Sequence, residues 1–389
     1  MQQLAGTRLV LQKTKKLGTK TWHPADSQRW PSLKGKSSTR FHSTYLQAHP
    51  DGSGKAHLRD PEDVLIRAED LVVEFPISQG RVVNAVSGVS LDVKQGETLG
   101  LVGESGCGKS TTAKSLIQLP PPTSGTVSYL GTDLTSLENK DLRKARTDLQ
   151  MIFQDPISSL NPRRKIGDVV AEPLRVWGPH DKNEQSSQVD AMLEAVGIDP
   201  AIARDKRPHE FSGGQCQRIS IARALVLNPQ VIICDEPVSA LDVSVQAQIL
   251  NMLEDLKADY GLTLVFIAHD LAVVKNISDR IAVMYLGKLC EVSESNVLYD
   301  SPAHPYTELL LGSSPVPDPT INIDITLVEE EDLPSPIDPP SGCRFRTRCR
   351  YATDRCAQEE PMMRQVSQDH YVACHHPLVS VSKMAEVSA

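Results

Sequence analysis

Short apolar runs alternate with turn residues and amphipathic stretches along the chain from about residue 64 onward. Each run is brief and is flanked by turn-forming residues, which predicts buried or half-buried strands. Residues 246–261 instead carry apolar side chains at i, i+3 and i+4 and end on Gly261, as an amphipathic helix with a glycine cap does. Because strands and helices alternate, we expect an α/β domain with a largely parallel sheet. The predicted strands are 71–75, 89–93, 97–103, 231–234 and 262–268, and further helices are expected at about 187–197 and 215–227.

Composition divides the chain into a leader, a central domain and a tail. Residues 1–50 carry nine Lys or Arg but a single acid, Asp26, and are rich in Ser and Thr. We expect residues 1–62 to form a basic, disordered leader, and an organellar transit peptide, which shares this composition, is the alternative. From about residue 312 the chain becomes Pro-rich and acidic, which predicts a linker into a cysteine-bearing tail at 312–389. The central domain, 63–311, is long enough to bury its own core.

Charge and hydropathy exclude two classes of protein. The net charge is −8, and beyond residue 50 the chain holds 32 basic against 48 acidic residues, a balance of −16. Because nucleic-acid phosphates are bound through clustered Lys and Arg, this acidic surface does not fit a general nucleic-acid binder. No run of eighteen apolar residues occurs, so the sequence predicts no membrane-spanning helix.

A glycine-rich turn follows the predicted strand at 97–103. GESGCGKST, residues 103–111, lies between this strand and a predicted helix, which is the setting in which G-x-x-x-x-G-K-[ST] binds phosphate. Its backbone N–H groups can turn toward phosphate oxygens at the positive end of the helix. We expect Lys109 to reach the β- and γ-phosphates and Ser110 to ligate Mg²⁺; the alternative is a chance match by a glycine-rich turn. The candidate residues are Gly103, Ser105, Gly106, Gly108, Lys109, Ser110 and Thr111.

Two carboxylates end the apolar run at 231–234. Asp235 can hold Mg²⁺ through water, and Glu236 can polarise an attacking water, whereas alone such a pair would be a solvated turn.

Ser212 can cap a helix whose N-terminal amides would face a phosphate. Four more motifs occur in the chain, namely QDP at 154–156, FSGGQ at 211–215, SALD at 239–242 and IAHD at 267–270.

With these motifs the chain resembles the ATP-binding-cassette (ABC) ATPases. The resemblance implies a P-loop ABC ATPase domain at 63–311, with a RecA-like core, an antiparallel β-subdomain and a helical subdomain at about 155–212, and a Cys-bearing C-terminal extension. FSGGQ is similar to the family signature, with Phe211 where Leu is common. Phe75 is the expected adenine-stacking aromatic, and an ordinary core Phe is the alternative. The remaining family positions are Ser212, Gly213, Gly214 and Gln215 of the signature, Gln154 of the Q-loop, Asp242 of the D-loop and the switch histidine His269.

The same resemblance implies a mechanism that needs two such domains. They dimerise head to tail, so that the P-loop of one and the signature turn of the other enclose each ATP, and a monomer has no complete site. Glu236 would act as the catalytic base, and His269 would hold the γ-phosphate and the attacking water. Gln154 would couple the γ-phosphate to the subdomain that touches the membrane partner. The Mg²⁺ ligands would be Ser110, Gln154 and Asp235.

Longer stretches are similar to one group of these ATPases, the ATPase subunits of bacterial dipeptide and oligopeptide importers, over about residues 64–378. The sequence segments SLNPR and YLGK favour the second, F-type subunit. The implied partners are a second ABC ATPase subunit, two transmembrane permease subunits and, indirectly, an extracytoplasmic solute-binding protein, at the cytoplasmic face of the cell membrane. An organellar location remains open, as do an ATPase for nickel, glutathione or another non-peptide solute and a soluble regulatory ABC ATPase without a membrane partner.

Four cysteines lie in the tail, separated by five, six and seventeen residues. Disulfides do not fit a reducing cytosol, and zinc sites prefer shorter gaps. Four thiolates with looser spacing suit an iron–sulfur cluster, and the resemblance adds that some peptide-importer ATPases bind a [4Fe-4S] cluster there. A cluster, zinc and no metal all remain open. The thiols are Cys343, Cys349, Cys356 and Cys374, and we expect Arg344, Arg346, Arg348 and Arg350 to favour their deprotonated form.

Overall fold

The computed structural model describes residues 54–179, 181–313 and 333–379. The predicted leader up to residue 53 and residues 314–332 of the predicted linker lie outside them. Residues 54–62 were assigned to the leader, but they pack on the protein: a ring nitrogen of His57 lies 2.6 Å from the Ser90 carbonyl oxygen, and the Arg59 guanidinium donates to the buried Asp92 carboxylate at 2.8 Å. The predicted boundary at residue 62 is therefore too late, because composition does not reveal these long-range partners.

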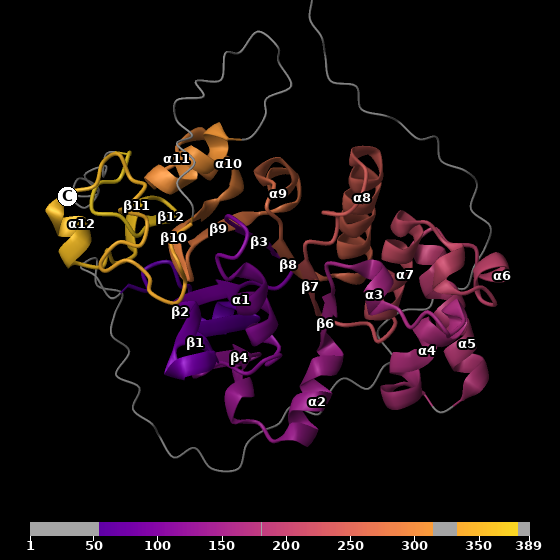
Figure 1. The fold of residues 1–389 in the computed structure, drawn as a ribbon. Helices are drawn as coiled ribbons and strands as arrows, with labels where there is room; N and C mark the ends of the chain where they lie inside the picture. The colour runs from indigo at the N-terminus through magenta and orange to yellow at the C-terminus, as the bar shows by residue number, and fades with distance from the viewer. Residues whose placement is uncertain (1–53, 180, 314–332, 380–389) are drawn as a thin grey trace, which may run out of the picture. The chain divides into compact units, whose positions relative to one another are not determined.

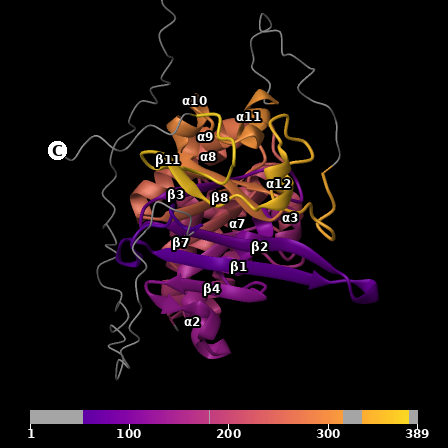
Figure 2. The same ribbon diagram turned by 90° about the vertical axis from the view of Figure 1, so that its left-hand side faces the viewer.

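One sheet has four antiparallel strands in the order β2–β1–β4–β5. Figure 2 shows β1, β2 and β4 side by side. Buried and partly exposed side chains alternate along β1, since one face of the sheet covers the core. The strands are β1 (Ile66–Pro76), β2 (Val82–Val93), β4 (Ser124–Tyr129) and β5 (Thr132–Asp133).

The second sheet has eight strands in the order β11–β12–β10–β9–β3–β8–β7–β6. The ladders from β9 to β6 are parallel, and those from β9 through β10 and β12 to β11 are antiparallel. β3, β7 and β8 are buried along their whole length, which explains their continuous apolar sequences. The strands are β3 (Thr98–Val102), β6 (Leu149–Ile152), β7 (Val231–Asp235), β8 (Thr263–Ile267), β9 (Arg280–Tyr285), β10 (Lys288–Glu294), β11 (Arg364–Ser367) and β12 (His370–Val372).

Helices flank the large sheet (Figure 1). The helices between β6 and β7 in the chain lie together in a group of their own. The sequence predicts a helical subdomain at about 155–212, which covers all of this group except α7. The group contains α3 (Pro156–Ser159), α4 (Ile166–Trp177), α5 (Lys182–Ala195), α6 (Pro200–Ala203) and α7 (Gly213–Leu225). The other helices are α1 (Lys109–Leu116), α2 (Asn139–Asp148), α8 (Val243–Tyr260), α9 (Leu271–Ile277), α10 (Ser295–Asp300), α11 (Pro305–Gly312) and α12 (Asp354–Gln358).

The elements predicted from apolar spacing are present in the structure. Each predicted strand lies within or overlaps a strand, and the stretch 246–261 lies in α8 with Gly261 as its left-handed cap at φ 64°. α5 begins before the predicted residue 187 because the Asp181 side chain caps it by accepting from backbone N–H groups. The sheet is parallel over only part of its width, because β10 and the tail strands β12 and β11 extend one side of it in antiparallel order.

Alternate residues of the buried strands pack on opposite faces of the large sheet. In β7, Ile232 and Cys234 belong to a core that includes Leu253 of α8. Val231 and Ile233 belong to a second core that includes strands of the antiparallel sheet and α1. Because both faces are covered, the polar side chains after β3, β7 and β8 can gather only beyond the ends of the strands.

The tail is anchored to the large sheet by a buried carboxylate. Glu291 of β10 accepts hydrogen bonds from the backbone N–H groups of Ala303 and His304, each at 2.8 Å. It also lies 2.6 Å from a ring nitrogen of His370 in β12. Both side chains are almost fully buried, and a buried charge needs such partners. The tail is thus part of the packed domain.

Candidate functional site

The loop 103–111 joins β3 to α1 and depends on two glycines. Gly103 has φ 148° and Gly108 has φ 101°, values that favour glycine. A Cβ at Gly103 would lie 2.1 Å from the Met284 carbonyl oxygen, and one at Gly108 would lie 2.2 Å from that of Ala85. The backbone of the loop is therefore packed tightly against β9 and β2.

Lys109 lies at the first turn of α1 and is folded back over this loop. Its ammonium donates to the carbonyl oxygens of Gly103 at 2.8 Å and Glu104 at 2.9 Å. The side chain is buried, so its charge is held against the backbone of the loop. A phosphate that entered the loop would meet this charge without a large movement of the chain.

Ser110 and Asp235 meet beside the loop. The Ser110 hydroxyl donates to the Asp235 carboxylate at 2.5 Å, and Lys114 pairs with the other oxygen at 3.1 Å. Hydroxyl and carboxylate oxygens are the ligands that Mg²⁺ prefers, and Mg²⁺ needs only one or two protein carboxylates when nucleotide phosphates complete its shell. The pair therefore fits Mg²⁺ bound together with a nucleotide.

Glu236 lies just past β7 in a left-handed conformation, with φ 47°, which costs backbone strain for a residue with a side chain. Its carboxylate accepts a hydrogen bond from the Gln154 amide nitrogen at 2.8 Å and lies 3.7 Å from Nδ1 of His269. Three distant motifs thus meet at one carboxylate. A hollow of about 360 Å³ adjoins them and is lined by Lys114, Phe153, Gln154, Asp155, Ser158, Ser159 and Asp235.

The signature turn lies apart from this group. Ser212 caps α7 as predicted: its side chain accepts from the Gln215 backbone N–H, and the Gln215 side chain accepts from the Ser212 backbone N–H. Ser212, Gln215 and Asp242 are exposed. Among the residues that the structure describes, no hydrogen bond or ion pair joins Ser212–Gln215 to the loop 103–111. The parts of an enclosed phosphate site that the resemblance implies are thus not joined to each other by a hydrogen bond or an ion pair within the described residues.

Phe75 lies near the end of β1, and 40% of its side chain is exposed. The alternative that it is an ordinary core Phe is therefore wrong. An exposed ring at the end of a strand is available for stacking. Its assignment to adenine stays a prediction.

The tail thiols are not activated as the sequence led us to expect. None of the cysteines in the described residues is in a disulfide. Burial raises the pKa of Cys343 to about 11 and that of Cys374 to about 12. The expectation that four arginines favour thiolates holds only for Arg350, whose charge lowers the pKa of Cys349 without offsetting the rise that burial causes, because the guanidiniums bind other acceptors. Arg344 donates to the Leu286 carbonyl, Arg346 to the Ser341 carbonyl, Arg348 to the Glu104 carboxylate and Arg350 to the Glu308 carboxylate.

The four thiols are neighbours: Cys349 and Cys356 raise the pKa of Cys343, and all three raise that of Cys374, in addition to the larger effect of burial. Even so, within 54–179, 181–313 and 333–379 no three His, Cys, Asp or Glu side chains are placed so that they could hold a metal ion. The tail therefore gathers the cysteines without arranging them as a ligand set.

Two residues of the site, Lys114 and Glu104, were not predicted from the sequence. Lys114 lies four residues after Ser110 on α1, so helix periodicity could have placed both beside Asp235. Glu104 occupies a variable position of the loop pattern, and no local signal announces its contact with Arg348, 244 residues further along the chain.

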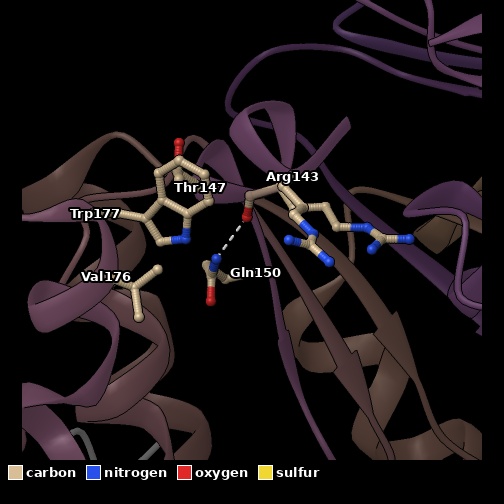
Figure 3. Close-up of a pocket in the computed structure, with 6 residues that line it drawn as sticks. Arg143, Thr147, Gln150, Val176 and Trp177 are labelled. Carbon is tan, nitrogen blue, oxygen red and sulfur yellow. Dashed lines mark hydrogen bonds between the residues drawn. The ribbon is translucent and has the colours of Figure 1, made fainter. Parts of the chain in front are cut away.

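A second hollow, of about 340 Å³, separates α4 from α2 and β6. Val176 and Trp177 reach it from α4, while Arg143, Thr147 and Gln150 reach it from α2 and β6 (Figure 3). Exposed fractions of 67% for Val176 and 45% for Trp177 are high for large apolar side chains. Such a patch marks a surface that another protein can cover.

Comparisons with known proteins agree with this geometry. The family model "ABC transporter" matches residues 86–239, and the model "Oligopeptide/dipeptide transporter, C-terminal region" matches residues 290–356. The chain is 52% identical over 322 residues to the oligopeptide transport ATP-binding protein OppF of Salmonella typhimurium, covering 80% of this chain and 96% of that protein. It is 44% identical over 324 residues to the di/tripeptide transport ATP-binding protein DppF of Pseudomonas aeruginosa, covering 81% and 98%.

Solved structures show the same fold. The dimeric post-hydrolysis state of the ATP-binding cassette MJ0796 with ADP and Pi matches with a TM-score of 0.55 and 28% identity, covering 59% of this chain and 98% of that one. The cbiO1 structure from Clostridium perfringens matches with a TM-score of 0.55 and 28% identity, covering 61% and 92%.

Together, the phosphate loop, the carboxylates after β7 and the two-sheet fold define an ATP-binding-cassette ATPase. Within that class the chain belongs to the family of oligopeptide and dipeptide transport ATP-binding proteins. No helix among the described residues has the length and apolar character to cross a membrane.

Proposed function

We propose that this chain hydrolyses ATP to power the import of dipeptides and oligopeptides through permease subunits. The observation that carries the proposal is the convergence of Gln154 and His269 on Glu236, in a chain 52% identical to an oligopeptide transport ATP-binding protein along 96% of that relative. Such a constellation binds a nucleotide and activates water.

We assign the roles at this site as follows. Lys109 leaves the loop carbonyls for the β- and γ-phosphates of ATP, while the backbone N–H groups of 103–111 donate hydrogen bonds to the phosphate oxygens. Ser110, Asp235 and Gln154 hold Mg²⁺, which neutralises phosphate charge when bound. Glu236 takes a proton from the attacking water, and His269, whose Nδ1 lies 3.7 Å from the carboxylate oxygen that Gln154 also contacts, orients the water and the γ-phosphate. Phe75 stacks on the adenine ring.

We further propose that each ATP is enclosed by two cassettes. The exposed Ser212–Gln215 turn supplies the second half of a site on a partner ATPase subunit, which is either another copy of this chain or a related cassette. Asp242, which is exposed at the start of α8, faces the same partner. Support comes from the exposed Ser212 and Gln215, since no hydrogen bond or ion pair joins the turn 212–215 to the loop 103–111 among the described residues.

The hollow between α4 and β6 is the surface that we assign to the permeases. It combines exposed Val176 and Trp177 with Arg143, and Gln154 follows β6 by two residues. A permease segment seated there would sense the γ-phosphate through Gln154. This arrangement would place the chain at the cytoplasmic face of the cell membrane, with a solute-binding protein on the opposite side. Residues 1–53 of the leader, which would support an organellar location, lie outside the described residues.

The metal at the tail is a separate proposal. We propose that Cys343, Cys349, Cys356 and Cys374 bind a [4Fe-4S] cluster, for which their side chains must turn toward one another. What supports it is that the thiols are neighbours and reduced, with Cys356 and Cys374 buried and Cys343 and Cys349 partly buried. Anaerobic purification should give a brown protein with stoichiometric iron and sulfide that a Cys343→Ser variant lacks. Stoichiometric zinc, or a colourless protein without metal, would overturn the assignment.

The transport proposal is tested with the full chain captured from its native membranes. We expect two hydrophobic permease subunits and a second cassette to copurify, and ATP hydrolysis in the reconstituted complex to rise with peptide-loaded binding protein. Stimulation by nickel or glutathione instead of peptides would assign a non-peptide solute. A chain recovered alone and without membrane partners would indicate the soluble regulatory ATPase.

A further inference from the structure

Glu104, at the second position of the phosphate loop, is held from three directions. Its backbone N–H donates to the Tyr306 hydroxyl of α11 at 2.8 Å. Its carbonyl accepts from Lys109. Its carboxylate accepts two hydrogen bonds from the Arg348 guanidinium, at 2.8 and 3.0 Å. Two of these three contacts come from elements outside the loop.

The contact between Arg348 and Glu104 fixes the relative orientation of the two side chains as well as attracting them. A guanidinium that binds a carboxylate through two parallel N–H bonds fixes the plane of both groups. The pair is shielded, with exposed fractions of 13% for the Arg348 side chain and 25% for Glu104. The guanidinium carbon also lies 5.9 Å from the ring centre of Tyr285 and 6.0 Å from that of Phe345, which adds a cation–π contribution.

The same tail segment reaches the other end of the loop. Arg344 donates to the carbonyl oxygen of Leu286, in the turn between β9 and β10. The next residue, Gly287, donates its N–H to the carbonyl oxygen of Cys107 in the loop at 2.8 Å. Arg344 and Arg348 flank Phe345, which is buried against Tyr285 and Tyr306. The cysteine-bearing segment therefore supports the loop at Glu104 directly and at Cys107 through the peptide group that joins Leu286 to Gly287.

We propose that Arg348 is a positioning residue of the ATP site. Through its contact with Glu104, Arg348 holds the phosphate loop in the shape that binds ATP. The cysteine-bearing tail thereby becomes a structural part of nucleotide binding, and its integrity sets the affinity for ATP. This inference rests on the proposed role of residues 103–111 as the phosphate site. It does not depend on which metal, if any, the thiols bind.

A simpler reading is that the ion pair only fastens the tail to the domain. The two readings differ in what they predict for ATP. If the ion pair only fastens the tail, its loss should destabilise the tail and leave the shape of the loop and its affinity for ATP unchanged. A positioning role predicts weaker ATP binding with a similar turnover rate at saturation, because ground state and transition state both lose the same preformed loop.

The chain offers a matched control for Arg348. Arg350 lies two residues further along the same segment and pairs with Glu308 at 2.8 Å, but that pair is exposed and touches α11 instead of the loop. Arg350→Gln removes the same chemical group and an ion pair of the same length. It leaves Glu104 untouched.

The test measures the dissociation constant of a fluorescent ATP analogue and the KM and kcat for ATP, with full-length wild-type, Arg348→Gln, Arg348→Lys and Arg350→Gln proteins. We expect Arg348→Gln to raise the dissociation constant and the KM roughly five- to tenfold, near the lower end of typical coupling between linked sites, with kcat little changed. Arg348→Lys, which keeps the charge but not the paired geometry, should fall between wild type and Arg348→Gln. Arg350→Gln should bind as the wild type does.

Wild-type affinity in Arg348→Gln, or an equal loss in Arg350→Gln, would overturn the inference. If Arg348→Gln does not fold, Arg348→Lys carries the test, and wild-type affinity in that variant would contradict the inference. Lys109→Ala separates this failure from failure of the phosphate site itself. Loss of binding in Lys109→Ala beside normal binding in Arg348→Gln removes only the role of Arg348, whereas normal binding in Lys109→Ala removes the phosphate site.

Discussion

Individual glycines show how single residues determine the loop. The G-x-x-x-x-G-K pattern identifies Gly103 and Gly108, but only the structure shows why they differ from Gly106. At Gly106, φ is +79° and a Cβ would meet nothing within 4 Å; at Gly108 it would lie 2.2 Å from the Ala85 carbonyl oxygen. Substitution at Gly106 thus meets backbone strain alone, and substitution at Gly108 meets strain and a backbone clash.

We therefore predict different costs for alanine at these two positions. Gly106→Ala should lower the free energy of unfolding by about 1 kcal/mol, the usual cost of a left-handed residue with a side chain. Gly108→Ala should lower it by more than about 3 kcal/mol, because backbone cannot move aside as a flexible side chain can. Urea unfolding of the nucleotide-free chain measures both. Equal losses in the two variants would contradict the close packing of the loop against β2.

Motif residues were predictable from sequence because their chemistry is local. Lys109, Ser110, Asp235 and Glu236 all follow or precede short apolar strands that the pattern identifies. The state of the tail thiols was not predictable, since the pKa of Cys343 depends on burial and on the distance to the neighbouring thiols Cys349 and Cys356. Neither quantity can be obtained from residue spacing.

Helix α11 links the tail to the phosphate loop at the scale of a secondary-structure element. Its N-cap is His304, whose Nδ1 accepts the backbone N–H of Tyr306 at 3.0 Å. Burial lowers the pKa of His304 from its usual 6.5 to about 4, and a protonated Nδ1 could not accept that hydrogen bond. The cap therefore exists only while the imidazole is neutral.

This cap makes stability depend on pH in a defined direction. Because the folded pKa is lower than the unfolded one, the unfolded chain binds protons more readily, so the contribution of His304 is complete above pH 6.5 and is lost as pH falls toward 4. We expect His304→Asn, which caps without titrating, to remove up to about 3 kcal/mol of the stability lost between these pH values. Denaturant unfolding from pH 7.5 to 4.5 measures it. His57, whose pKa burial also lowers, titrates in both proteins, so parallel curves would contradict the role of His304.

The predicted elements were correct where their apolar pattern is complete and incomplete where pairing is remote. β3, β7, β8 and α8 follow from local periodicity. The pairing of β12 with β10 does not, because the tail strand is three residues long and its pattern carries too little information. Its position is set by the buried contact between Glu291 and His370.

At the scale of the whole molecule, the site is assembled from segments spread over most of the described chain. The loop after β3, the carboxylates after β7 and His269 after β8 meet because parallel strands end at the same edge of a sheet. This much could be predicted from the sequence. The contribution of the tail could not, since 244 residues separate Arg348 from Glu104.

The central claim is that this site hydrolyses ATP to drive peptide import. Its most direct test is the peptide-stimulated ATP hydrolysis of the reconstituted transporter that contains either the wild-type chain or Glu236→Gln, with ATP binding measured in parallel. Removing a general base typically slows a reaction by at least about a hundredfold, so we predict that stimulated turnover falls by this factor while ATP remains bound. Undiminished peptide-stimulated turnover with Glu236→Gln would contradict the account.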